Sequence, residues 1–93
     1  MAAMQLPAIA TLDEAAALAA TLPAAVVGGS GVLRVDASAL TSFDSSTIAL
    51  LMQARRLAQA AGRGFDVAGA PPKLAELARL YGVEELLSLS AKG

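Results

Sequence analysis

The sequence of 93 residues contains no cysteine and no histidine. Without cysteine the chain cannot form a disulfide or use a thiolate nucleophile, and without histidine it lacks the most common general acid or base near neutral pH. The same two absences remove the usual ligands of zinc. We therefore expect no metal centre, no cofactor and no enzyme of the ordinary acid-base or thiol kind. The lack of cysteine also agrees with a reducing compartment.

Aromatic residues and net charge are scarce as well. Aromatic residues make up 3% of the chain, and 7 Lys+Arg against 8 Asp+Glu leave a net charge of -1. With 56% hydrophobic residues, the core must consist of aliphatic side chains and alanine. A nearly neutral chain lacks the basic surface of a dedicated nucleic-acid binder. The expectation is a thin aliphatic core, outer faces open to a partner and no binding of nucleic acid.

Long apolar runs are also missing. Thr21, Pro23 and the GGSG of 28–31 interrupt the alanine-rich segment, which is shorter than the roughly 20 apolar residues of a membrane-spanning helix. No positively charged residue precedes Arg34, so the first segment lacks the charged start of a secretory signal. We expect a cytoplasmic protein with no direct membrane insertion.

Apolar patterns and helix-ending residues divide the chain into alternating strands and helices. Acidic residues at 13–14 favour the start of the first helix, whose apolar stripe includes Leu12, Leu18 and Leu22, and Pro23 is expected just past its end. The predicted elements are a strand at 4–12, a helix at 12–22, a strand at 32–40, a helix at 45–62, a strand at 64–70, a helix at 71–82 and a last apolar piece at 83–89 that fits either a helical turn or a strand. This order predicts one α/β domain over 1–93, with helices packed on a central sheet.

An acid and three hydroxyl residues, Asp44, Ser45, Ser46 and Thr47, stand where the strand gives way to the long helix. Asp44 or Ser45 can act as N-cap, because its side-chain oxygen can accept a free backbone N–H of the first turn. The same helix end also favours an anion such as a phosphate, so a phosphorylated hydroxyl would change the surface without breaking the helix. Both interpretations, a cap and a contact surface, stay open from these residues alone.

The helix that follows carries apolar residues on the side expected to face solvent. Ile48 and Met52 lie one turn apart among polar residues that include Arg55 and Arg56. Apolar residues within an arginine-containing polar rim are typical of protein-binding patches. The alternative is that a neighbouring loop covers Ile48 and Met52.

Four segments together resemble the STAS domain: VDASAL at the end of a strand, FDSST before the long helix, FDVAG in the next strand and LAELARLYGVEELL near the end. This family includes anti-sigma-factor antagonists, the cytoplasmic tails of sulfate transporters and the small STAS subunit of the Mla phospholipid-transport ABC complex. The resemblance covers about residues 30 to 90. It implies a small STAS fold, a central mixed sheet with helices packed against it, and a shortened amino-terminal strand pair.

Within the family, LARLYGVEELL resembles the carboxy-terminal LA-x-LY segment of the small Mla subunit (MlaB-like). That resemblance implies a non-catalytic accessory subunit that binds the ATPase subunit of an ABC transporter and is peripheral to the inner membrane through this partner. The hydroxyl matching Ser45 and the start of the following helix would then lie at the ATPase contact. We therefore expect the partner-binding residues to be Asp44, Ser45, Ser46, Thr47, Ile48, Met52, Arg55 and Arg56.

The resemblance also implies an alternative, an anti-sigma-factor antagonist that a serine kinase switches by phosphorylating the position of Ser46. In that pattern a glycine follows, and Thr47 stands in its place here, which argues against the switch. An enzyme would have to depend on Asp44, Ser45 or Lys73, with no base placed to activate a serine. The sequence has neither a glycine-rich phosphate loop of the G-x-x-x-x-G-K type nor an evident signal of a lipid cavity, so neither a nucleotide nor a lipid is predicted as a ligand.

Overall fold

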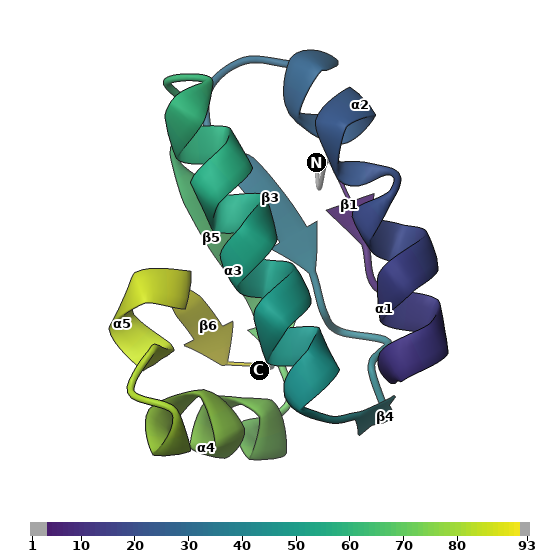
Figure 1. The fold of residues 1–93 in the computed structure, drawn as a ribbon. Coiled ribbons are helices and arrows are strands. Elements are labelled where there is room, and N and C mark those ends of the chain that lie inside the picture. The colour runs from purple at the N-terminus through teal and green to yellow at the C-terminus, as the bar shows by residue number, and fades with distance from the viewer. Residues whose placement is uncertain (1–3, 92–93) are drawn as a thin grey trace.

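Strands and helices alternate along the chain in the computed structural model, which describes residues 4–91 (Figure 1). The elements are β1 (Met4–Gln5), β2 (Ile9–Ala10), α1 (Leu12–Ala19), α2 (Leu22–Val27), β3 (Leu33–Asp36), β4 (Ser42–Phe43), α3 (Ser45–Ala60), β5 (Phe65–Ala70), α4 (Pro72–Leu80), α5 (Glu84–Leu87) and β6 (Leu89–Ala91). The predicted long helix, the strand after it and the next helix are confirmed as α3, β5 and α4. The last apolar piece contains both a helical turn, α5, and the beginning of a strand, β6.

The main sheet has the strand order β1-β3-β5-β6, and β2 pairs with β4 in a separate ribbon. The α/β fold class is confirmed, but the expected mixed sheet is not observed, because every strand pair in residues 4–91 is parallel. Helices α1 and α2 connect the first strands to β3, α3 leads to β5, and α4 and α5 lead to β6. Helical crossovers of this kind join parallel strands.

One face of the main sheet is covered by helices, and the other is polar. Leu33, Val35 and Val67 point inward and have no exposed surface, and α3 crosses this inner face (Figure 1). On the opposite face Arg34 and Asp66 lie directly across from each other in β3 and β5. Two hydrogen bonds of 2.9 Å join the Arg34 guanidinium to the Asp66 carboxylate. The face with the exposed Arg34–Asp66 ion pair is open to solvent. The apolar core therefore lies between the other face of the sheet and the helices.

The core is aliphatic, as the composition predicts. Its largest fully buried side chains are Leu6, Leu22, Leu33, Leu51, Leu74, Leu87, Val35, Val67 and Thr47. Phe43 and Phe65 are only partly buried and pack at the edge of the core.

Three local predictions need correction. The expected strand at 4–12 is two strands of two residues each, on either side of Pro7. The sequence placed Pro23 beyond a helix end, but Pro23 lies in the first turn of α2 (Leu22–Val27), where its missing N–H is tolerated. Strand β4 (Ser42–Phe43) was also missed.

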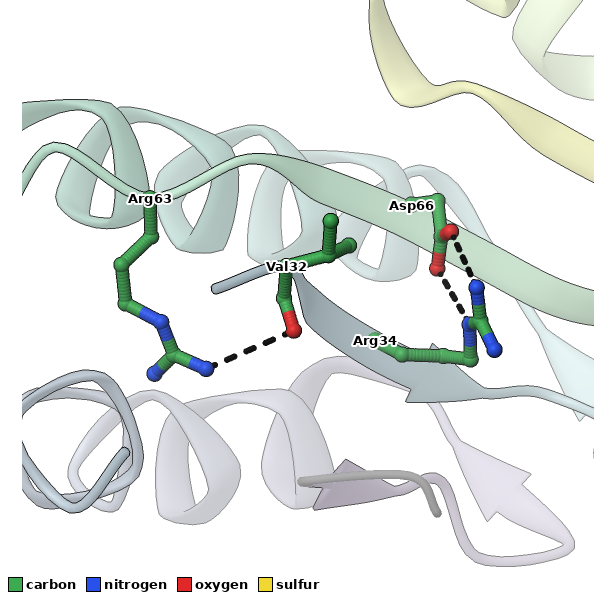
Figure 2. Close-up of polar contacts among 4 residues, drawn as sticks. All are labelled: Val32, Arg34, Arg63 and Asp66. Carbon is green, nitrogen blue, oxygen red and sulfur yellow. Dashed lines mark hydrogen bonds and ion pairs between the residues drawn. The ribbon is translucent and has the colours of Figure 1, made fainter. Parts of the chain in front are cut away.

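Arg63, which sequence reasoning did not single out, fastens α2 to the loop before β3. Its side chain is 8% exposed and donates to backbone carbonyl oxygens only, including that of Val32 (Figure 2). The acceptors are Gly31 O at 2.9 Å, Val26 O at 2.8 Å, Ala25 O at 3.2 Å, and Ser30 O and Val32 O at 3.4 Å each. This clamp holds α2 beside the carboxy-terminal half of α3.

Candidate functional site

The start of α3 is capped by Asp44. The Asp44 Oδ1 atom accepts a hydrogen bond of 2.8 Å from the backbone N–H of Ser46. In return, the backbone N–H of Asp44 donates to Thr47 Oγ1 at 3.3 Å. The predicted cap is therefore confirmed, with Asp44 rather than Ser45 as the capping residue. Ser45 is left exposed at the surface.

Thr47 belongs to the interior. Its side chain has no exposed surface, and its hydroxyl donates a hydrogen bond of 2.6 Å to Ala10 O in β2. This bond ties the first turn of α3 to the β2–β4 ribbon. The expectation that Thr47 faces a partner is wrong, because no part of it reaches the surface.

Ile48 is also buried. Its side chain is 5% exposed and belongs to the main core, and Met52 is partly buried at the edge of that core. The predicted exposed pair of Ile48 and Met52 is therefore wrong. The reason is that α3 contacts α1 and α2, α4 and α5, and the sheet, so its buried arc is wider than the single face assumed from the helical period.

The structure instead arranges Ser45, Ala49, Met52 and Arg56 in one outward line along α3. Their spacing of four, three and four residues places them on the same side of the helix. Ser45, Ala49 and Arg56 are exposed, and Met52 is partly exposed. Arg55 lies off this line and instead lines a pocket of about 240 Å³ together with Glu85. Of the two predicted arginines, only Arg56 lies on the outward line.

Beside this line lies an uncharged groove of about 220 Å³ between α1 and α3. Its lining residues are Leu12, Ala15, Ala16, Ala19, Ser46, Ala49, Leu50 and Gln53. Leu12 is 67% exposed, which corrects its expected place on the buried stripe of its helix. Ser46 is half-buried at the wall of the groove. We call the outward line and this groove together the α1/α3 surface.

One carboxylate, that of Asp44, lies at the start of α3, and another, that of Glu14, lies in the first turn of α1. Glu14 in the first turn of α1 accepts a hydrogen bond of 2.6 Å from the Thr11 hydroxyl, and this bond lowers the pKa of the Glu14 carboxyl. The negative charge of Asp44 acts on the same pKa in the opposite direction, so the two acids lie close enough to interact. An anion bound at Ser46 would meet the carboxylate of Asp44, whose Oδ1 already accepts the Ser46 N–H, and like-charge repulsion disfavours such a complex.

Residues 4–91 contain no group of three or more acidic side chains that could hold a metal ion. In the same part of the chain, none of the helices has both the length and the apolar character needed to cross a bilayer. The features of the site are therefore an apolar groove, hydroxyl groups and one exposed arginine, which suit contact with another protein.

Comparison with known proteins identifies a family. A family model described as "Mlab, STAS domain" matches residues 2–88. A solved anti-sigma-factor antagonist (STAS) domain protein from Planctomyces limnophilus is similar in fold, with a TM-score of 0.81 over 96% of this chain and 80% of that chain. The two sequences are 20% identical, so this likeness concerns the fold alone. No curated protein matches the sequence significantly.

Proposed function

The chain belongs to the MlaB-like STAS domain family, and we propose that it is a non-catalytic accessory subunit that binds the ATPase of an inner-membrane phospholipid-transport ABC complex. STAS domains are generally accessory or regulatory modules that interact with other proteins. The observation that carries the proposal is the match of an MlaB-type model to residues 2–88. Under this proposal the protein is cytoplasmic and is held at the membrane only through its partner.

The ATPase would dock on the α1/α3 surface. Leu12 and Met52 supply apolar area there, and Ala49 between them leaves room for a partner side chain. Ser45 and Arg56 provide a polar rim, which is the usual arrangement of a protein interface. These residues supersede the exposed Ile48/Met52 pair expected from the sequence.

A non-catalytic role is supported by the surroundings of Asp44, Ser45 and Lys73, the residues on which catalysis would have to depend. Asp44 Oδ1 is engaged in capping α3. No hydrogen bond or ion pair in the described part of the chain joins Asp44, Ser45 and Lys73 to one another. A serine without an adjacent base is a weak nucleophile.

The alternative function, an anti-sigma-factor antagonist switched at Ser46, receives less support from the geometry. Ser46 is half-buried in the groove wall, and a phosphate on it would lie near the Asp44 carboxylate, which accepts the Ser46 N–H. Thr47 fills the place of the family's glycine with a buried side chain. If peptide mass spectrometry of protein from cells finds phosphate on Ser46, and Ser46→Asp changes partner binding, the switch is the better explanation.

The proposal is tested by capture of the Mla-type ATPase subunit from the same organism on the immobilised chain. We expect Leu12→Glu and Met52→Glu each to weaken capture at least about tenfold, because an unpaired carboxylate buried in an interface costs several kcal/mol. Leu80→Glu is the matched control, since Leu80 is 79% exposed on α4, away from the α1/α3 surface (Figure 1). Circular dichroism checks that each variant is folded.

Two outcomes would contradict the proposal. If the wild-type chain fails to capture the purified ATPase, the function is wrong. If Leu12→Glu and Met52→Glu bind as tightly as the Leu80→Glu control, the ATPase does not dock on the α1/α3 surface.

A further inference from the structure

We infer that the partner covers the whole outer length of α3, reaching a second groove beside α2, and that it offers a carboxylate to Arg56 between two apolar contacts. This inference rests on the proposed function, because it names the chemistry of the surface that the ATPase would present.

The second groove lies between α2 and the carboxy-terminal half of α3 and has a volume of about 260 Å³. Its lining residues are Pro23, Val26, Val27, Leu57, Ala60 and Ala61. Val27 is 83% exposed, the most exposed large apolar side chain described. A valine that protrudes beside an apolar groove is available for contact with an apolar partner.

Both grooves open along the same side of α3. The residues of α3 that line them are Ser46, Ala49, Leu50, Gln53, Leu57, Ala60 and Ala61. Successive residues of this set are one, three or four positions apart, so they fall within one side of the helix. Helices α1 and α2 follow each other along this side of α3 (Figure 1). The sequence contains no charged residue from 15 to 33, so the flank formed by α1 and α2 is neutral over nearly its entire length.

Along the axis of α3, Arg56 lies between the two grooves, after Gln53 of the first groove and before Leu57 of the second. It is exposed, and its side chain takes part in no hydrogen bond or ion pair within the described residues. The ion pairs there use Arg34 and Arg79 instead. An arginine between two uncharged grooves is suited to pair with a carboxylate of a partner, because its planar guanidinium donates two parallel hydrogen bonds.

The area required by a stable complex also favours a contact along the full helix. A standard interface buries about 800 Å² on each partner, which is about a sixth of the 5070 Å² accessible surface of this chain. The 16 residues of α3 span about 24 Å at 1.5 Å per residue. The first groove occupies only the amino-terminal half of that length, so a partner confined to it would bury too little surface.

Titration calorimetry with the purified Mla-type ATPase subunit of the same organism tests this extension. We expect Val27→Glu and Arg56→Glu each to weaken binding at least about tenfold, by burying an unpaired charge and by repelling the partner's carboxylate. Leu80→Glu and Arg55→Glu are the matched controls and should change the Kd by less than about twofold. Arg55 is the informative control, because it is the neighbouring arginine but lines the pocket near Glu85.

The outcomes separate the two levels of the proposal. If Leu12→Glu weakens binding but Val27→Glu and Arg56→Glu do not, the contact is confined to the first groove and the extension is wrong, although the proposed function stands. If the wild-type chain does not bind the ATPase, both the proposed function and the extension to the second groove are wrong. If Val27→Glu abolishes a self-associated form measured by light scattering and leaves ATPase affinity unchanged, the groove takes a second copy of this chain and the inference is overturned.

Discussion

Replacing Arg63 by methionine tests whether a buried guanidinium holds α2 and the following loop in place. Arg63 is 8% exposed and no carboxylate is among its hydrogen-bond acceptors. Its positive charge is balanced instead by carbonyl dipoles at the carboxy-terminal end of α2, where a helix favours cations. Methionine keeps most of the aliphatic stem in place, so Arg63→Met removes chiefly the hydrogen bonds.

The size of the effect follows from the three shorter bonds, at 2.8 Å, 2.9 Å and 3.2 Å. The two bonds of 3.4 Å are near the distance limit and add little. Hydrogen bonds to charged groups contribute about 1.5–3 kcal/mol each, but water can replace part of this at a loop next to solvent. At about 1 kcal/mol per bond, we expect Arg63→Met to lower the free energy of unfolding by about 3 kcal/mol. Arg63→Lys keeps the charge but loses the planar guanidinium that donates several hydrogen bonds. We expect it to lower the free energy of unfolding by about 2 kcal/mol.

Urea denaturation followed by circular dichroism at pH 7 measures both losses. The control is Arg34→Met, which breaks an ion pair on the open face of the sheet and should cost much less, because exposed pairs contribute little. Figure 2 shows the different surroundings of the two arginines, Arg63 at the carbonyl oxygen of Val32 and Arg34 paired with Asp66 across β3 and β5. If Arg63→Met is no more destabilising than Arg34→Met, the hydrogen bonds of Arg63 do not hold α2 and the following loop in place.

Two further predictions concern the amino ends of α3 and α1. Thr47→Val should lower the free energy of unfolding by about 1–2 kcal/mol, because Ala10 O loses its buried donor, and Thr47→Ser should retain most of the stability; urea denaturation compares the two. Thr11→Val should raise the pKa of Glu14 toward its ordinary value of 4.5, as measured by NMR titration of the side-chain carboxyl. Because the folded-state pKa is lowered, the Glu14 carboxylate stabilises the fold above its unfolded-state pKa, and this contribution is lost as the pH falls through the folded-state value. The stability difference between wild type and Thr11→Val that comes from Glu14 should therefore be present at pH 7 and vanish in strong acid.

The elements that the sequence predicted well are long and have clear end signals. Helix α3 begins after Asp44 and hydroxyl residues, and Gly62 lies just beyond its end. Strand β5 and helix α4 are likewise bounded by glycine or proline residues. Strands β2 and β4 have two residues each, too few for any alternation to be visible. They exist because Ile9 pairs with Ser42, a contact between distant parts of the chain that a local pattern does not contain.

The candidate site was predicted only in part, because helical periodicity does not say how many neighbours a helix has. The prediction assigned α3 one buried face and left Ile48 outside it. Contacts of α3 on both flanks enclose Ile48, whereas Arg56 stays outside. The groove between α1 and α3 depends on which helix lies beside α3, and so the exposed position of Leu12 could be recognised only after the fold was known.

The run of four polar residues that begins α3 cannot serve a single purpose, because successive residues point about 100° apart around a helix. Asp44 turns back to cap the backbone, and Thr47 points inward to Ala10 O. Ser45 faces outward, and Ser46 borders the groove. The cap and the proposed contact surface are therefore not competing interpretations of the same residues, since each involves different members of the run. It follows that a partner approaching the start of α3 meets the hydroxyl of Ser45 directly, and that Thr47 affects binding only by holding the first turn of α3 in place.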